Sequence, residues 1–377
     1  MAFLQNIDIS IVSQWIVGAA GAVYTGFLLF IITGVLRTKN TKAQAQPSVS
    51  VIVPAHNEEA EIGKCLQALL AQDYPEELTE LVIVVDRSID ETREIAETFR
   101  EHDDRVQIIT IDHVPDGYSP KKYALSRGIE ESTGEIILTT DADCRSGKDW
   151  ITGMVSHFTE DTGFVAGIVY TKPVGGPASY LAGIDGVVTS IIGAGTTGWN
   201  RGIACRGGNF AYRRSVYEEV NGFQGVGIQQ VLSGDDDLFL QKAKRKTRYG
   251  FRFSTLPETV VQEDIPDNLG DIYRRRRRHI DASKHFNRNV QVGYLAYNVA
   301  NILIIAGALA MVWTRMLFPV ALWAFLVKFL LDTTAGYLIL KPVREFRILA
   351  ILPVWEFYNV FKELFISPLG LFGKIRW

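Results

Sequence analysis

Long apolar stretches lie near both ends of the chain and enclose a mixed, more polar middle. The first, from Ile11 to Leu36, contains no charged residue. As a helix it is long enough to cross the roughly 30 Å hydrocarbon core of a bilayer. Two more stretches follow near the C-terminus, from Val292 to Trp313 and from Leu317 to Leu340. The pattern predicts three membrane-spanning helices around one polar domain.

The charged residues within and beside these stretches refine the prediction. Lys328 and Asp332 are four residues apart in the third span, so we expect them to pair inside the helix bundle. Cations follow the first span from Arg37 and the third from Lys341, which predicts a cytoplasmic central domain in an integral protein of the inner or plasma membrane. A cleaved signal peptide is disfavoured because no basic region precedes the first stretch. Prolines and charges interrupt residues 348–371, which we predict to form a re-entrant or interfacial helix.

Between residues 48 and 200, short β-rich runs alternate with helical patterns. The predicted strands cover residues 49–53, 81–85, 106–111 and 136–140. Apolar residues recur at helical spacing from Ile62 to Leu70, and we expect Asn57 to cap this helix. Ser88 to Glu91 is a capping-box pattern for the next one. Repeated strand–helix units predict an α/β fold with a mainly parallel sheet, whose ligands bind at the carboxyl ends of the strands.

Composition excludes some classes of function. The net charge of −3 gives no global basic character, so we expect no nucleic-acid partner. The three cysteines, Cys65, Cys144 and Cys205, have no CxxC spacing. They therefore favour reduced thiols in a cytosolic domain over a disulfide framework or a zinc site.

Two acidic motifs in the polar middle suggest the chemistry. Asp141 and Asp143 directly follow the predicted strand at 136–140, and a second group extends from Gly234 to Asp237. Carboxylates at i and i+2 of a strand end can face the same way. Such a pair of hard oxygen donors suits Mg²⁺ or Mn²⁺ carrying a diphosphate. With the second motif as a source of a base, the pattern indicates sugar transfer from a nucleotide-sugar to an alcohol at a membrane.

Six segments together resemble the membrane-integrated family 2 glycosyltransferases, which include cellulose, chitin and hyaluronan synthases and ceramide glucosyltransferase. In order they are VSVIVPAHNEE, VVDRSIDET, TTDADC, GGNFAYRRSVYEEVNGF, SGDDDLFL and RRRRRHIDASK. The resemblance covers about residues 48–285 and implies a GT-A nucleotide-sugar-binding fold, a UDP-sugar donor, a divalent cation and inversion at the anomeric carbon. We expect a membrane anchor (1–42), a cytoplasmic GT-A domain (43–267), a basic interface helix (268–291) and a C-terminal membrane domain (292–377).

The resemblance also implies roles for residues at the ends of the first strands. Asp86 is expected to accept a hydrogen bond from the uracil ring. The segment that holds the nucleoside is matched by Pro54, Ala55 and Glu58. In SPKKYALSRG, which resembles a conserved helix of the family, Lys122 is the expected contact to phosphate or base, with Lys121 as the alternative.

Metal, sugar and base are assigned in the same way. Asp143 is expected to ligate the metal, and Asp141 to contact the ribose or the metal shell. The segment expected to let the backbone approach the sugar comprises Gly207, Gly208 and Asn209. Asp236 is the expected catalytic base, with Asp235 as the alternative.

The basic segment from Arg274 to His279 departs from the family pattern Gln-Gln/Arg-x-Arg-Trp. Arg275 replaces the glutamine, and Arg278 matches the arginine expected to bind the diphosphate. Both should project from one helix face. His279 replaces the tryptophan that in relatives helps to form the acceptor site. Five arginines before a span also favour contact with anionic lipid, so both roles stay open.

We therefore predict transfer of a hexose or N-acetylhexosamine from UDP to a lipid or glycan at the cytoplasmic membrane face. One alternative is a processive polysaccharide synthase that exports its polymer. Three spans make a narrow channel, so that function would require a homodimer. A non-enzymatic membrane transporter or scaffold is a further alternative, which the two acidic motifs disfavour. A nucleotidyltransferase is disfavoured because no glycine-rich triphosphate loop is present.

Overall fold

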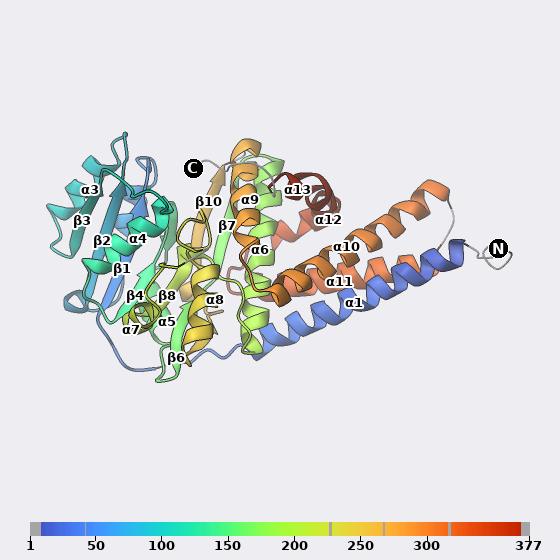
Figure 1. The fold of residues 1–377 in the computed structure, drawn as a ribbon, viewed down its shortest axis with the longest axis horizontal. Helices are drawn as coiled ribbons and strands as arrows, with labels where there is room; N and C mark the ends of the chain where they lie inside the picture. The colour runs from blue at the N-terminus through green and yellow to red at the C-terminus, as the bar shows by residue number, and fades with distance from the viewer. Residues whose placement is uncertain (1–8, 42, 226–227, 267, 316–317, 371–377) are drawn as a thin grey trace.

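An α/β domain lies at one end of the molecule and a bundle of long helices at the other (Figure 1). The computed structural model describes residues 9–41, 43–225, 228–266, 268–315 and 318–370. The bundle consists of α1 (Ile9–Arg37), α10 (Arg288–Thr314) and α11 (Pro319–Leu340). Two further helices, α6 (Pro177–Gly198) and α9 (Leu269–Ser283), run between the domain and the bundle.

Seven strands form the main sheet, in the order β3-β2-β1-β4-β8-β6-β9. They are β1 (Val49–Ala55), β2 (Thr79–Asp86), β3 (Val106–Ile111), β4 (Ile136–Thr139), β6 (Thr162–Ala166), β8 (Phe210–Arg213) and β9 (Gly250–Phe253). The first four strands pair in parallel, as the repeated strand–helix units predict. β8 then runs antiparallel to both β4 and β6. Two strands exceed their predicted ranges at the carboxyl end, β1 by Pro54 and Ala55 and β2 by Asp86.

Helices cover both faces of the main sheet. They are α2 (Ile62–Leu70), α3 (Thr92–Arg100), α4 (Pro120–Glu130), α5 (Trp150–Val155), α7 (Arg214–Glu219) and α8 (Asp237–Lys246), with 3₁₀ turns η2 (Glu76–Leu78), η3 (Gly207–Asn209) and η4 (Pro257–Thr259). Side chains alternate along β1: Ile52 joins the core that contains α4, whereas Val51 and Val53 join the core that contains α2. Burial on both faces explains why the strand is a continuous apolar run.

A small second sheet contains β5 (Cys144–Ser146), β7 (Val169–Val174) and β10 (Val261–Pro266). β10 lies between the other two, antiparallel to β5 and parallel to β7. Its register places Glu263 opposite Cys144, the residue that follows the Asp141–Asp143 motif. This pairing brings a distant part of the chain next to the paired carboxylates.

The two predicted helix caps are wrong. The side chain of Asn57 does not cap α2, and Ser88 does not cap α3. Instead, the side-chain oxygen Oδ1 of Asn57 accepts a hydrogen bond from the Ile89 backbone N–H at 2.9 Å, and the Ser88 hydroxyl accepts one from the Asn57 backbone N–H at 3.0 Å. These polar side chains link the two loops that follow β1 and β2, so they stabilise the sheet edge rather than the helix starts.

Helices α1, α10 and α11 match the three predicted spans and are long and apolar enough to cross a membrane. α6 also meets this criterion, although sequence analysis included it in the polar domain. It lies across the end of the bundle (Figure 1), and 56% of its most apolar window is buried, against 22–33% for the others. A Cβ atom at Gly34 of α1 would overlap the carbonyl oxygen of Gly195. α6 therefore packs tightly against α1 and lies between the domain and the bundle.

A buried ionic network joins the bundle to the C-terminal segment. Lys328 Nζ lies 2.7 Å from Asp332 Oδ2, which confirms the predicted pair, and it also contacts Glu356. The Tyr24 hydroxyl donates to Asp332 at 2.8 Å. Glu356 belongs to a chain of short helical segments: η5 (Phe346–Ile351), α12 (Leu352–Phe361), the π-helical η6 (Lys362–Ile366) and α13 (Ser367–Gly370). Among the described residues, none of these segments meets the criterion of length and hydropathy that α1, α6, α10 and α11 meet.

Candidate active site

The carboxyl ends of β1 and β2 form one end of a large cavity. Pro54, Ala55 and Asp86 all line it, as their positions at the strand ends predict. The Asp86 carboxylate is held by the neighbouring Arg87, whose Nε and Nη2 atoms lie 2.8 and 3.0 Å from its two oxygens. Arg87 adopts a left-handed backbone with φ of 51°, which is rare for a residue with a Cβ and common near functional sites.

Glu58 also lines the cavity. It lies near the carboxylates of Asp141 and Asp143 and not only at the end expected to hold the nucleoside. Burial, and then the negative charges of Asp143 and Asp141, raise the pKa of Glu58 to about 8. A carboxyl group with such a pKa is mostly protonated at neutral pH unless a cation is present. Glu58 is thus part of the acidic group at the end of β4.

Asp141 and Asp143 follow β4 and line the same cavity. Oδ1 of Asp143 is buried and has no hydrogen-bond partner among the residues that the structure describes. Burial, followed by the charges of Glu263 and Asp141, raises the pKa of Asp143 to about 7. Ligand atoms of the two aspartates and of Cys144 lie within 4.8 Å of one another, but burial keeps the pKa of the Cys144 thiol well above its usual range. The carboxylates therefore fit a hard divalent cation such as Mg²⁺ or Mn²⁺, whereas the thiol does not.

The structure distinguishes the two adjacent lysines of α4. Lys121 lines the cavity, and its Nζ lies 2.6 Å from Asp141 Oδ1 and 3.3 Å from Asp235 Oδ2. Lys122 is fully buried and points elsewhere. Its Nζ donates to three backbone carbonyl oxygens, those of Ile228, Val231 and Ser233, at 2.7–2.8 Å. The geometry therefore favours Lys121 as the phosphate contact, and Lys122 anchors the loop that precedes the second acidic motif.

Three consecutive aspartates lie where α8 begins, and each has a different environment. Asp236 Oδ2 accepts a hydrogen bond from the Gly207 amide at 2.8 Å, and its Oδ1 accepts one from the Asp237 amide at 2.7 Å. Burial and the adjacent charge of Asp235 raise the pKa of Asp236 to about 6. Burial also acts on Asp235, but the Lys121 and Lys122 ammonium groups hold its pKa below the usual value. Asp236 is thus the carboxylate with a pKa suited to accepting a proton near neutral pH.

The glycine segment at η3 lies between the two acidic motifs. A Cβ at Gly207 would lie 2.7 Å from Asp235 Oδ2, and one at Gly208 would lie 3.2 Å from Asp141 Oδ2. Only Gly207 of this segment lines the cavity. The Asn209 side chain is buried, accepting from Trp150 Nε1 at 2.9 Å and donating to two carbonyl oxygens. The glycines therefore let the two carboxylate groups approach each other, and Asn209 holds the fold instead of reaching a substrate.

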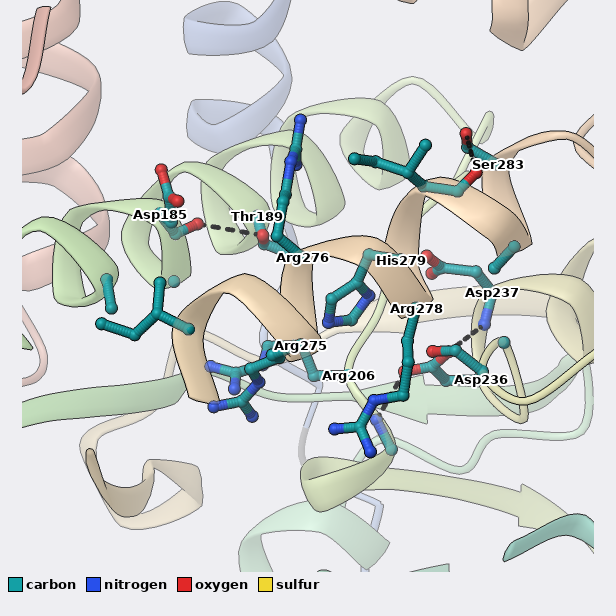
Figure 2. A pocket seen from close by; sticks show the side chains of 18 of the residues that line it. Asp185, Thr189, Arg206, Asp236, Asp237, Arg275, Arg276, Arg278, His279 and Ser283 are labelled. Atoms are coloured by element: carbon teal, nitrogen blue, oxygen red, sulfur yellow. Dashed lines mark hydrogen bonds between the residues drawn. The ribbon is translucent and has the colours of Figure 1, made fainter. Parts of the chain in front are cut away.

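Helix α9 presents its basic residues in two directions (Figure 2). Arg275 and Arg278 project from one side, as their spacing predicts, and Arg276 projects from the other. Arg275 pairs with the buried Glu263, which also pairs with Arg206 Nη2 at 2.5 Å. Burial opposes ionisation of Glu263, but the two guanidinium groups lower its pKa to about 2.

His279 lines the cavity beside Arg275 and Arg278. Burial, and then the charge of Arg275, lower the pKa of His279 to about 3, so the imidazole is neutral. Glu263 and Arg206 were not found by sequence analysis. Glu263 reaches the site only through the pairing of β10 with β5. Arg206 directly precedes the predicted Gly207, and its position next to that segment is the signal that could have found it.

One cavity of about 1550 Å³ is lined by both acidic motifs, by Lys121 and by the Arg275, Arg278 and His279 side of α9. It begins at the strand ends, passes the two acidic motifs and α9, and extends between α6, α10 and α12. Among the sequence-predicted site residues, Lys122, Gly208 and Asn209 do not line it. Helix α10 of the bundle therefore contributes directly to the site.

Comparison with known proteins agrees with this geometry. A family model described as Glycosyl transferase family 2 matches residues 50–220, and one described as Glycosyl transferase family group 2 matches residues 136–358. The chain is 28% identical over 236 residues to the probable glycosyltransferase YdaM of Bacillus subtilis, covering 62% of this chain and 54% of the relative. It is 32% identical over 127 residues to a beta-monoglucosyldiacylglycerol synthase of Synechocystis sp., and this match covers 34% of this chain and 26% of the relative. The chain spans about half, or less, of the length of these curated relatives.

Among solved structures, the fold is similar to that of the mannosyltransferase PcManGT from Pyrobaculum calidifontis in complex with GDP-Man and Mn²⁺. The TM-score is 0.58 at 20% identity, and the match covers 95% of this chain and 98% of the other. This likeness confirms the predicted GT-A fold with its mainly parallel sheet. Since the second family model covers more than half of the 377 residues, the chain belongs to the family 2 glycosyltransferases.

Proposed function

We propose that the chain is an inverting, metal-dependent glycosyltransferase that moves a hexose or N-acetylhexosamine from a UDP-sugar to a lipid or glycan. One observation carries this proposal: a single cavity contains the Asp141–Asp143 pair, contains Asp236, and continues between α10 and α12. Its volume of about 1550 Å³ exceeds the roughly 300–1,000 Å³ of a pocket for one small ligand. The donor and the acceptor headgroup fit together in it.

The donor occupies the domain end of the cavity in this proposal. Asp86, fixed by Arg87, accepts a hydrogen bond from a ring N–H of the base at the ends of β1 and β2. The diphosphate then lies between Lys121 and Arg278, two cations that line the cavity from opposite elements. Charge-assisted hydrogen bonds of this type are stronger than neutral ones and fix the leaving group in position.

The carboxylates of Asp141 and Asp143 hold the divalent cation in this proposal. The unpartnered, buried Oδ1 of Asp143 supports this assignment because such an atom is costly unless a partner is present. When bound, the cation offsets the diphosphate charge and stabilises UDP as the leaving group.

Asp236 acts as the base. It removes the proton from the acceptor hydroxyl while that oxygen forms a bond to C1 of the sugar and the bond from C1 to the diphosphate oxygen breaks. Attack from the face opposite the leaving group inverts the configuration at C1. The two amide hydrogen bonds to Asp236 orient the carboxylate for this step. Asp235 stays ionised beside Lys121 and balances its charge.

The acceptor is presented from the membrane at the cytoplasmic face. The cavity extends between α6, α10 and α12, and cations follow the first and third predicted spans from Arg37 and Lys341. A membrane acceptor is also compatible with the lipid synthase named among the relatives.

The proposal is tested by measuring nucleoside diphosphate release from purified protein with a panel of UDP- and GDP-sugars, membrane lipids and Mn²⁺. Release from a UDP-sugar that depends on both the lipid extract and the cation supports it. Release that continues in excess chelator would contradict the metal requirement, and a preference for a GDP-sugar would contradict the UDP assignment.

A further inference from the structure

The part of the cavity nearest the bundle contains two cations that are already paired with carboxylates. Lys362 Nζ lies 2.7 Å from Asp185 Oδ1, and Arg276 Nη2 lies 2.5 Å from Glu363 Oε1. All four residues line the cavity. In Figure 2, Arg276 and Asp185 lie on the side of α9 away from Arg275 and Arg278. We call the part of the cavity between α6, α9, α10 and α12 the chamber. Because each of these two cations is paired with a carboxylate, the pairs add little net positive charge to the chamber and give it little attraction for an anion.

One carboxylate oxygen of Asp185 accepts two hydrogen bonds, which fix the side chain. Its Oδ1 accepts hydrogen bonds from Lys362 Nζ at 2.7 Å and from Trp355 Nε1 at 2.8 Å. Lys362 also lies over the rings of Trp355 and Tyr358, 5.5 and 5.6 Å from their centroids. The Asp185 side chain is 29% exposed and lines the cavity, which leaves Oδ2 as an acceptor for a hydroxyl donor.

The catalytic end of the cavity favours the same kind of acceptor. Asp235, Asp236 and Asp237 place three adjacent carboxyl groups at the proposed point of attack. A lipid phosphate that attacked with its own oxygen would meet this acidic group and would have no proton for Asp236 to remove. An alcohol brings no charge and needs a base. The acidic cluster therefore fits a hydroxyl nucleophile better than a phosphate.

We propose that the acceptor is an uncharged lipid whose headgroup bears free hydroxyls, a glycerol or a sugar, and that Asp185 orients this headgroup. This inference rests on the proposed function and specifies its acceptor. Asp185 Oδ2 accepts a hydrogen bond from a hydroxyl that does not react, while a second hydroxyl gives its proton to Asp236. Apolar residues of the chamber, Leu295, Phe361 and Ile366, contact the start of the acyl chains.

The lipid class is tested with purified full-length protein in vesicles, a productive UDP-sugar and Mn²⁺. Three acceptors are compared: dioleoylglycerol, monoglucosyl dioleoylglycerol and undecaprenyl phosphate. We expect kcat/KM for at least one neutral lipid to exceed that for undecaprenyl phosphate by about tenfold or more. Equal or better transfer to undecaprenyl phosphate would overturn the inference and leave the proposed function intact. Donor binding without transfer to any lipid or glycan would overturn both.

The role of Asp185 is tested by Asp185→Asn, with Glu345→Gln as the matched control at an exposed carboxylate outside the cavity. Loss of a hydrogen bond to a charged acceptor should raise KM for the neutral lipid by about ten- to a hundred-fold. KM for the UDP-sugar should stay within about twofold, since Asp185 is on the acceptor side. Unchanged donor binding by calorimetry shows that the variant is folded. An unchanged KM for the neutral lipid would show that Asp185 does not bind the acceptor headgroup.

Discussion

Replacing Asp236 by asparagine should remove the base while leaving the donor site in place. A general base typically contributes about 10²- to 10⁴-fold to the rate, which corresponds to about 3–5 kcal/mol of barrier. Asp236 lies within the cavity and is fixed by two backbone amides, so it is oriented for proton transfer. We therefore expect Asp236→Asn to lower kcat by about 10²-fold or more and to leave UDP-sugar affinity nearly unchanged.

The substitution also has a structural cost, which requires a matched comparison. Both oxygens of Asp236 accept from amides, so the NH₂ group of asparagine would face the Gly207 or the Asp237 amide. Losing one such bond costs about 1–3 kcal/mol of stability. Asp237→Asn carries a similar risk, because Asp237 Oδ1 accepts from the Cys205 amide at 2.7 Å. It does not remove the proposed base, so its kcat should fall far less than that of Asp236→Asn.

The assay is steady-state UDP release with saturating acceptor, measured across pH and combined with donor binding by calorimetry. The base must be deprotonated, and the pKa of Asp236 is about 6. The kcat/KM of the wild type for the UDP-sugar, which reports the pKa of the free enzyme, should therefore be flat above pH 7 and should decrease as the pH falls through 6. A kcat for Asp236→Asn within about tenfold of wild type would refute the assignment. So would a larger loss in Asp237→Asn, and Asp235 would then be the next candidate.

Three further predictions concern the cations and the metal site. Excess chelator should abolish UDP release, and Asp143→Asn should raise the Mn²⁺ concentration needed for half-maximal activity; full activity in chelator would contradict this. Lys122→Met should lower the melting temperature, because three backbone carbonyls lose the ammonium group that donates to them, at a cost of about 2 kcal/mol or more. Lys121→Met should mainly weaken binding of the UDP-sugar. Arg278→Ala should lower kcat/KM about ten- to a hundred-fold, and Arg277→Ala should have little effect. Equal, mild losses at both arginines would indicate a membrane contact alone.

The parallel half of the fold and the position of the first acidic motif follow from local sequence. Ile136 to Thr139 is an apolar run buried on both faces of the sheet, so the strand must end where the polar Asp141 begins. The three spans can likewise be predicted from local sequence, since each is a long apolar stretch with few charges. α6 was not recognised because glycine and threonine dilute its apolar pattern, and its burial depends on packing against α1.

The parts of the site that sequence analysis missed depend on long-range pairing. The pairing of β10 with β5 places Glu263 opposite Cys144, next to Asp143. Arg275, the ionic partner of Glu263, comes from a separate helix. The choice between Lys121 and Lys122 depends on the rotation of α4 about its axis, since consecutive helical residues point about 100° apart. No pattern within the SPKKYALSRG segment fixes that rotation. Sequence alone also does not show that Asn209, two residues after the cavity-lining Gly207, turns its side chain into the core.

The most direct test of the account is the product itself. Purified full-length protein in lipid vesicles, supplied with a UDP-sugar and Mn²⁺, should convert a membrane lipid into one that is heavier by one hexose or N-acetylhexosamine. Mass spectrometry of the extracted lipids should detect this product for the wild type and not for Asp236→Asn. A product that forms equally with both proteins, or the absence of any glycosylated lipid or glycan while the UDP-sugar binds, would contradict the account.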